Sequence, residues 1–520
     1  MRAVVEKLPK TLDESYERVL KDIKEDNRER ARRLFHCLAV AVRPLRVKEL
    51  AETLLFDFDT ARGGIPEFHA DQRSHEQEET VLSLCSSLIT VVENRGSRVV
   101  QFSHLSVKEF LISKYLASSA SLTPYHILPG PSHTILAQVC LGLLLHVDDN
   151  DDNKSVKDSP LAEYAARHWI VHAQFEDVAS NVEDGMKSLF NSDKPHFRAW
   201  IGLYDIDAES YGSLPSKIPS PVYYSALCGI HGLVRHISIM HPEHMNAIGG
   251  SFGFPLVAAL CRNHFAVAEL LLELGGRVDV RDTRQQTALH KIIDRHDKVA
   301  TDAVRFLLDH GADVNARRDD LWTPLHLAAN NGQFSVARML LQRQADVNSR
   351  NGDGQAPLHL LSRRGISPDE DDDGSEIAEL LLEHGANVNE KDEDNATPLH
   401  LASYNKRLKI VRVLLEHGAN ADAEKDGGET PLQLALSGNR DAQEDGIGVV
   451  RLILESGAEA YAREKYDISM SDLFFCFGEK TGQVLLDGGE KFKAKDNWDQ
   501  TVFCLWIEGK YHLTLTTTSL

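Results

Sequence analysis

The stretch Thr397-Pro398-Leu399-His400-Leu401-Ala402, followed by the apolar run Ile410 to Leu415 and by Gly418-Ala419-Asn420, decides the fold. Its threonine is a good helix N-cap, and its proline fits the first helical turn, where no backbone donor is needed. The glycine can adopt the left-handed conformation that ends a second helix. The stretch therefore predicts two short antiparallel helices. Because so small a unit cannot bury its own apolar face, it needs a neighbour on each side.

The proline position of this stretch recurs through the second half of the chain. The intervals are 34, 33, 36, 33, 41 and 33 residues, and an apolar run followed by Gly-Ala recurs in step. The period and the T-P-L-H string resemble ankyrin repeats over roughly residues 218–500. The resemblance implies a solenoid of about seven helix pairs and a decayed eighth. The recurring positions are Pro221, Pro255, Ala288, Pro324, Pro357, Pro398 and Pro431.

Length and composition indicate a folded chain of two or three domains, since 42% of the 520 residues are apolar. The seven cysteines lie far apart without a C-x-x-C pair, which disfavours a disulfide framework and favours a reducing compartment. The longest apolar run, residues 135–147, is too short to span a bilayer, and residues 1–10 lack the apolar core of a signal peptide. We therefore expect a cytoplasmic protein.

The formal net charge of −21 arises entirely after residue 120. Residues 1–120 hold 19 basic and 19 acidic side chains, whereas the remainder holds 38 basic and 59 acidic ones. Phosphate binding needs a surplus of cations. Nucleic acid is therefore not an expected ligand of the repeats.

The first 125 residues predict helices followed by a strand hairpin and a further helix. Pro44 ends the second helix, and the segment 94–97 is a credible hairpin turn. Ser106 and Glu109 form an expected capping box for the last helix. This order is typical of a winged helix. The expected elements are helices at 12–23, 30–42, 47–55, 80–88 and 107–117, a Gly-Gly-Ile-Pro loop at 63–66, and strands at 89–93 and 98–102.

Four segments resemble fungal NACHT-ankyrin proteins, the NLR-like sensors. They are residues 8–20, 37–45, 102–111 and 161–169, and they include the strings LPKTLDESYERVL and FSHLSVKEFL. The resemblance implies a NACHT core that binds ATP or GTP, a winged helix that helps to hold the off state, and repeats that receive the signal. It places residue 1 after that core, and the sequence contains no G-x-x-x-x-G-K-S/T phosphate loop. We therefore expect no NTPase activity.

The candidate catalytic and metal-ligating residues fit structural roles better. Ser103-His104 and Asp57-Phe58-Asp59 lack a third group to orient them. The acidic segment 148–153 lacks the glycine and the glutamate of a calcium loop. One recurring histidine per repeat leaves ligands too far apart for a tetrahedral metal, and the ankyrin resemblance implies that each bridges backbone and threonine hydroxyl in adjacent repeats. We therefore expect no catalytic residue, no cofactor and no metal. These histidines are His290, His326, His359 and His400.

The expected architecture is mostly α. A winged-helix-like α+β module at 1–125 precedes a helical connector at 126–205 and an ankyrin-repeat α-solenoid at 206–520. We expect a non-enzymatic scaffold that binds other proteins through the concave face and hairpin tips, as an NLR-like signalling or sensor fragment. One alternative is the regulatory portion of a nucleotide-driven NACHT NTPase whose motor is missing from this chain. The other is winged-helix DNA binding, although the helix at 80–88 contains no Lys or Arg.

Partner binding is expected at the hairpin tips, whose residues are assumed not to be needed for stacking. A second surface is expected at two acidic inserts, residues 369–373 and 441–445, because repeats three, five and seven have extra residues between their helices. These inserts would attract a basic partner segment. No nucleic acid or membrane is expected as a partner. The tip residues are Arg317, Arg318, Asp320, Trp322, Arg350, Asn351, Asp353, Lys391, Glu393 and Asp394.

Overall fold

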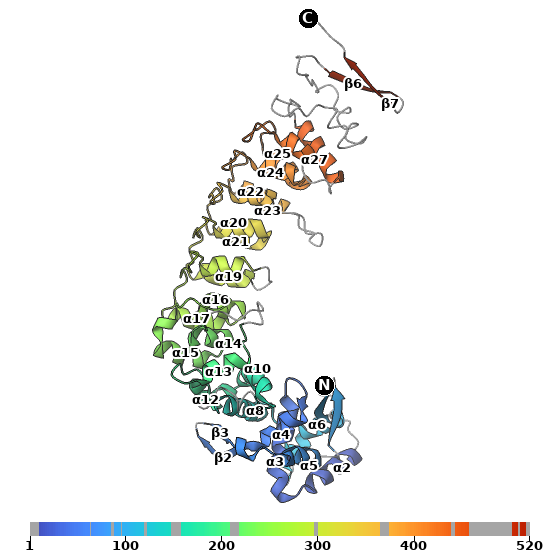
Figure 1. Ribbon diagram of the computed structural model, residues 1–520, viewed down its shortest axis with the longest axis vertical. Helices are drawn as coiled ribbons and strands as arrows, with labels where there is room; N and C mark the ends of the chain where they lie inside the picture. Colours follow the sequence, from blue (N-terminus) through green and yellow to red (C-terminus); the bar gives the residue numbers. More distant parts are fainter. Residues whose placement is uncertain are drawn as a thin grey trace. The chain divides into compact units, whose positions relative to one another are not determined.

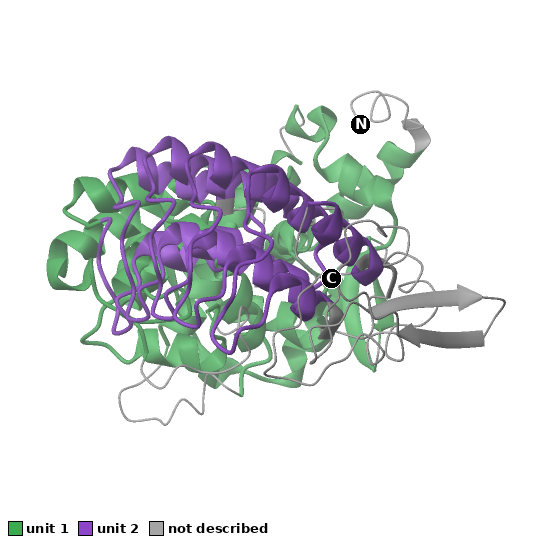
Figure 2. Cartoon of the chain, turned by 90° about the horizontal axis from the view of Figure 1, so that it is seen from above, with its two compact units in different colours: residues 1–277 green, residues 278–520 purple. Residues whose placement is uncertain are grey.

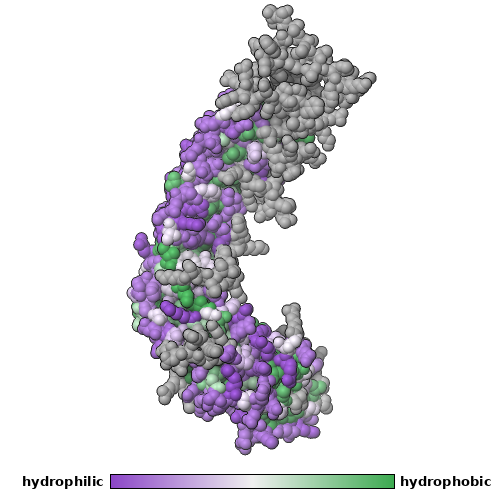
Figure 3. All heavy atoms as spheres, viewed as in Figure 1, coloured by the Kyte–Doolittle hydropathy of each residue, from purple (hydrophilic) through white to green (hydrophobic). Residues whose placement is uncertain are grey.

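The computed structural model describes most of the chain, and the described part is mostly helical, as expected (Figure 1). The chain divides into two compact units, residues 1–277 and 278–520 (Figure 2). Apolar side chains are largely buried, and hydrophilic residues cover most of the described surface in the view of Figure 3. The described residues are 10–62, 64–84, 88–94, 96–118, 122–146, 158–207, 218–295, 300–363, 374–437, 443–456, 502–507 and 510–515.

The first unit begins with a winged helix. Its three strands form an antiparallel sheet in the order β1-β5-β4, with Val100 of the central strand opposite both Leu45 and Val91. Helices α3 and α4 pack against this sheet, and their side chains Leu34, Phe35 and Leu50 are fully buried. The winged-helix expectation is thus confirmed. The elements are α2 (Lys10–Lys21), α3 (Arg28–Val40), β1 (Leu45–Arg46), α4 (Val47–Glu52), α5 (His75–Leu84), β4 (Ile89–Asn94) and β5 (Ser97–Phe102).

A second hairpin lies between α4 and α5, where only a loop at 63–66 was expected. Strands β2 (Phe56–Arg62) and β3 (Ile65–Phe68) pair there, and Gly64 takes the positive φ of 77° that the turn needs. The buried rings of Phe56 and Phe68 contact each other at a tilt, with centroids 4.8 Å apart. The loop expectation is wrong because these two rings close the hairpin onto the core.

The helix after the wing differs from the expected one at 107–117. It is two helices, α6 (Leu105–Leu111) and α7 (Lys114–Ala117). The expected capping box of Ser106 and Glu109 is wrong, because Nδ1 of His104 accepts the backbone N–H of Ser106 and caps α6 instead. The Ser106 hydroxyl is bound to the Tyr16 hydroxyl of α2, at 2.9 Å.

The connector is a helical layer with an aromatic core. Trp169 and Trp200 meet edge to face at 5.6 Å, and Trp200 donates its indole N–H to the carbonyl of Ala166. Buried Glu52 of α4 accepts the backbone N–H of Leu161, which ties the connector to the winged helix. The connector helices are α8 (Pro129–Leu144), α10 (Ala162–Ala173), α11 (Val178–Asn181), α12 (Glu183–Leu189) and α13 (His196–Leu203).

Two helix pairs end the first unit. The first helix of each pair begins at its expected proline, and like helices of the two pairs pack on each other. A short 3-10 helix, η6, follows the first pair. The elements are α14 (Pro221–Cys228), α15 (His231–Met240), η6 (Pro242–His244), α16 (Pro255–Cys261) and α17 (Phe265–Glu273).

The second unit stacks five more helix pairs, and the first helix of each begins at the position that the period predicts. Three second helices end at the expected glycine, since Gly311, Gly385 and Gly418 have φ values of 81°, 87° and 83°. The pairs are α18 (Ala288–Ile293) with α19 (Ala300–Asp309), α20 (Pro324–Asn331) with α21 (Phe334–Gln342), α22 (Pro357–Arg363) with α23 (Ser375–Glu383), α24 (Pro398–Tyr404) with α25 (Leu408–Glu416), and α26 (Pro431–Ser437) with α27 (Gln443–Glu455). A hairpin of β6 (Val502–Ile507) and β7 (Lys510–Leu515) follows.

The longer intervals fall between paired helices, as expected. Two residues separate α20 from α21, whereas the gaps in repeats three, five and seven run over 294–299, 364–374 and 438–442. The acidic residues 369–373, the side chains of residues 441–445 and the decayed repeat near 484–490 lie outside the described residues. The surface expected at the acidic inserts therefore stays a prediction.

Candidate functional site

The recurring histidines hold neighbouring repeats together. In the third repeat, Nδ1 of His290 accepts the backbone N–H of Thr287, and Nε2 lies 3.1 Å from the carbonyl oxygen of Trp322 in the next repeat. Burial lowers the pKa of His290, His326 and His400 to about 4. Each imidazole is therefore neutral at pH 7 and donates through Nε2. The expected structural role is confirmed, with the threonine in the same repeat and the carbonyl in the next.

The hairpin tips of the second unit form a continuous ledge. One backbone hydrogen bond links each tip to the one before it: Asp319 N–H donates to the carbonyl of Arg284, Gly352 to that of Asp320, Glu393 to that of Asp353, and Asp426 to that of Asp394, over 2.7–3.2 Å. The tips therefore present side chains from a fixed backbone. All ten expected partner-binding residues lie on this ledge.

Some of these ten residues also stabilise the ledge. Asn351 is only 3% exposed, and its Oδ1 accepts the N–H groups of Asp353 and Gln355. Arg350 donates to the carbonyl of Lys391, and Nζ of Lys391 donates to the carbonyl of Glu424. The assumption that the tips play no part in stacking is therefore wrong for Asn351, Arg350 and Lys391, because their side chains close turns or bridge repeats.

The tip before α20 has a different character. The Arg318 guanidinium donates to both carboxylate oxygens of Asp320 at 2.7 Å and lies over the Trp322 ring, 5.1 Å from its centroid. Arg317 is exposed, and its side chain has no ion-pair or hydrogen-bond partner among the described residues. This tip thus combines a half-buried tryptophan, an internally paired arginine and a free one.

Leu321 of the same tip was missed by the sequence analysis. It has a φ of 60° and its side chain is 42% exposed. A bulky residue rarely takes this left-handed conformation. The equivalent residues of the other tips also have a positive φ. Gly354, Asn395 and Gly428 tolerate this conformation better than leucine does, and Gln285 is polar. A leucine at the position of a turn glycine was the available sequence signal.

The residues considered for catalysis have local structural roles. Nδ1 of His104 caps α6, and Asp57 accepts the backbone N–H of Asp59 at 2.9 Å. Helix α5, the recognition helix of a DNA-binding winged helix, has the sequence HEQEETVLSL, with three glutamates and no Lys or Arg. The calcium-like segment 148–153 lies outside the described residues. Among the described residues, His104 and Asp57 thus serve local structure, and α5 lacks the cations that a groove-reading helix uses to hold phosphates.

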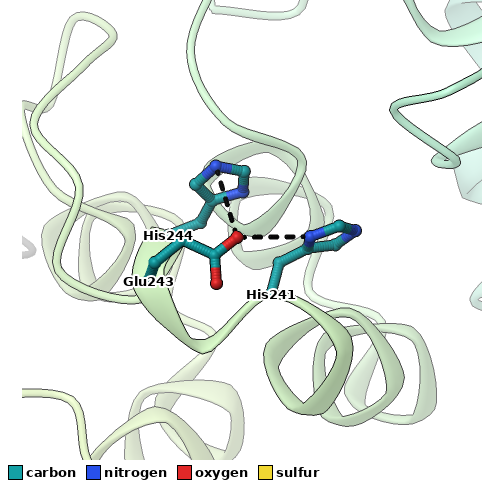
Figure 4. A group of neighbouring side chains, drawn as sticks. All are labelled: His241, Glu243 and His244. Carbon is teal, nitrogen blue, oxygen red and sulfur yellow. Dashed lines mark hydrogen bonds and ion pairs between the residues drawn. The ribbon is translucent and has the colours of Figure 1, made fainter.

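A group of three possible metal ligands lies at the end of α15. Nδ1 of His241 is 3.3 Å from Oε1 of Glu243, and Nε2 of His244 is 3.9 Å from the same oxygen (Figure 4). Among the described residues, this is the one group of three or more His, Cys, Asp or Glu side chains close enough to share a metal ion. These three residues were not among the metal ligands considered from the sequence, although the string His-Pro-Glu-His at 241–244 was an available signal.

Comparisons with protein families agree with this fold. The family described as "Ankyrin repeats (3 copies)" matches residues 225–318, 256–351, 300–392 and 369–464. The family described as "GPI inositol-deacylase, winged helix domain" matches residues 16–123. The chain thus combines a winged-helix domain with ankyrin repeats, a repeat class that binds other proteins.

Two curated relatives share part of this chain. The azaphilone pigments biosynthesis cluster protein L of Monascus ruber is 30% identical over 292 residues, which are 52% of this chain and 60% of that protein. The ankyrin repeat and SAM domain-containing protein 6 of Mus musculus is 37% identical over 107 residues, 20% of this chain and 12% of that one. The chain therefore spans less than two thirds of either relative.

Among solved structures, the ankyrin repeat domain of Bcl-3 is similar at 24% identity and a TM-score of 0.38, over 46% of this chain and all of that one. No helix in the described part of the chain is both long and apolar enough to cross a membrane.

Proposed function

We propose that the chain is a non-enzymatic scaffold in the cytoplasm, and that its partner protein docks on the ledge of hairpin tips around residues 316–323. The ankyrin repeats support protein binding, and the backbone bonds between tips support a preformed surface, which lowers the entropy lost on association. The free cysteines Cys37, Cys140, Cys228 and Cys261 are compatible with a reducing compartment.

Leu321 is the observation that carries this proposal. Its left-handed backbone costs on the order of 1 kcal/mol, and its exposed side chain recovers little of that by burial. Strained residues of this kind concentrate at functional sites. Burial of the Leu321 side chain in an apolar pocket of a partner would offset the free-energy cost of its backbone conformation.

The neighbours of Leu321 fit such an anchor. Trp322 and Arg318 are residue types enriched in interface hot spots, and their mutual stacking holds both in place. Arg317 supplies a guanidinium that a partner carboxylate can pair with. The partner that fits this tip offers an apolar pocket beside an acidic residue.

The test uses Leu321→Asn in the full chain. Asparagine tolerates the left-handed conformation, so the free energy of unfolding should stay equal or rise by up to about 1 kcal/mol. A photo-crosslinker at position 321 should capture a defined partner, and Leu321→Asn should lose that partner by co-purification. Tyr404→Asn, at an exposed apolar residue of α24, is the matched control. Equal binding by Leu321→Asn and wild type would refute the proposal.

A second candidate function is the regulatory part of a nucleotide-driven NLR-like signalling protein. The match of residues 16–123 to a winged-helix family and the resemblance to NACHT-ankyrin proteins support it. Sequencing the full-length transcript distinguishes it from the scaffold, since the second candidate needs an upstream nucleotide-binding core.

In both cases this chain alone should bind no nucleotide, because the sequence has no phosphate-cradling loop. Calorimetric titration of the purified chain with Mg-ATP and Mg-GTP should give only heats of dilution. Micromolar binding of either nucleotide would contradict this expectation.

A further inference from the structure

Three donor atoms converge where α15 ends and η6 begins. Nδ1 of His241, Oε1 of Glu243 and Nε2 of His244 all lie within 4.8 Å of one another. Figure 4 shows a nitrogen of each imidazole facing the same carboxylate oxygen of Glu243. The side chains of the two histidines are about one third exposed, at 32% and 34%, and that of Glu243 is 62% exposed. An ion can therefore reach all three from solvent.

We propose that His241, Glu243 and His244 form a binding site for a divalent first-row transition metal, with zinc as its representative. Zinc bonds to imidazole nitrogen and carboxylate oxygen of about 2.0–2.2 Å imply donors roughly 3.3–3.5 Å apart in a tetrahedron. The observed separations of 3.3 and 3.9 Å from the carboxylate oxygen need only small side-chain rotations. Two imidazoles disfavour calcium and magnesium, which prefer oxygen ligands.

The backbone of residues 241–244 is held in place before any ion binds. His241 N–H donates to the carbonyl of Ile237 at 2.8 Å and ends α15, and His244 N–H donates to the carbonyl of His241 at 3.0 Å. Pro242 locks its own φ between them. Met245, which follows, is only 6% exposed and anchors the turn. Only side-chain torsions remain to be ordered, so the entropy lost on binding is small.

The protonation pattern also suits a metal. Nδ1 of His244 is buried and has no hydrogen-bond partner among the described residues, so Nε2 is the nitrogen that faces an ion. The repeat histidines are different, because backbone groups occupy both ring nitrogens.

Three protein ligands leave one position open in a tetrahedral site. Water fills such a position in an isolated chain, and a donor group of another molecule can replace it. The site lies in the first unit, whereas the tip ledge is built by the second. It is therefore independent of the scaffold proposal.

Calorimetric titration of the full chain with zinc chloride tests the proposal. We expect one saturable site whose affinity falls at least about tenfold in His241→Ala, His244→Ala and Glu243→Gln. His231→Ala is the matched control, because this exposed histidine of α15 lies outside the group, and it should bind zinc like the wild type. Calcium and magnesium chloride should not compete.

Two results would overturn the proposal. One is wild-type protein with no saturable zinc binding; the other is equal affinity in wild type and in the His241→Ala, His244→Ala double variant. Circular-dichroism melts without metal check that the variants fold. Glu243→Gln changes only one exposed group, so it keeps the test decisive if a histidine variant fails to fold.

Discussion

Single residues of a repeat serve two opposite purposes. His326, for example, binds Thr323 of its own repeat through Nδ1 and the carbonyl of Gln355 in the next repeat through Nε2, and it must be neutral to do so. Leu321 does the reverse, since it is strained and exposed and makes no repeat more stable. The stability of the stack and the proposed binding surface therefore depend on different positions of the same repeat.

The histidines make the repeat stack sensitive to acid. The folded pKa of about 4 of His290, His326 and His400 lies below the ordinary 6.5, so between these values the unfolded chain binds more protons than the folded one. The free energy of unfolding should therefore fall as the pH drops from about 6.5 to 4, by up to about 1.4 kcal/mol per pH unit for each histidine. Denaturant melts across this window measure the slope.

His326→Gln should reduce that slope, because it removes one titrating group. The control is His417→Gln, which changes an exposed histidine of the same repeat array and should leave the slope unchanged. If both variants keep the wild-type slope, the repeat histidines are not the groups that titrate.

At the scale of the element, the second helices carry the stacking energy. Leu414 of α25 is fully buried, so Leu414→Ala should lower the free energy of unfolding by about 2–5 kcal/mol through the cavity that it leaves. Lys391→Ala should cost less, about 0.5–1.5 kcal/mol, because it removes a single exposed hydrogen bond between neighbouring tips. Urea melts of the two variants provide the measurement. Similar losses would mean that α25 does not pack as described.

The sequence predicted elements best where their signals are local. A capping threonine followed by a proline, as in Thr397-Pro398, marks a helix start by itself. All seven first helices begin at the predicted position. The β2–β3 hairpin was missed because its packing depends on distant segments of the chain. Phe56 and Phe68 contact each other, Phe56 packs on Gly142 of α8, and Phe68 meets the ring of His146. Tertiary packing, not local propensity, decides that hairpin.

The candidate sites were predicted less well than the elements. The tips were placed correctly, but the sequence did not reveal that Asn351 closes its own turn, since an asparagine at a tip can equally face solvent. Leu321 and the His241 group depend on backbone conformation, the one on a positive φ and the other on a helix that ends at residue 240. Neither can be read from residue type alone.

At the scale of the whole chain, two compact units are present, and ankyrin helix pairs occur in both. In the first unit, polar groups from the winged helix reach into the connector: the Tyr164 hydroxyl accepts the backbone N–H of Val42, and His36 is bound to Ser132 at 2.6 Å. The winged helix and the connector therefore form one cooperative structure.

Buried Glu52 has a practical consequence for anyone who divides this chain into pieces. Its carboxylate, 3% exposed, accepts from Ser159 and Leu161 of the connector and pairs with Arg73. A fragment that stops near residue 125 would lack Ser159 and Leu161, two of these three partners, and would leave the buried carboxylate with Arg73 alone, which is among the costlier defects a fold can carry. Because the contacts of Glu52 join the winged helix to the connector, an expressed fragment should keep residues 10–207 together rather than end where the winged helix ends.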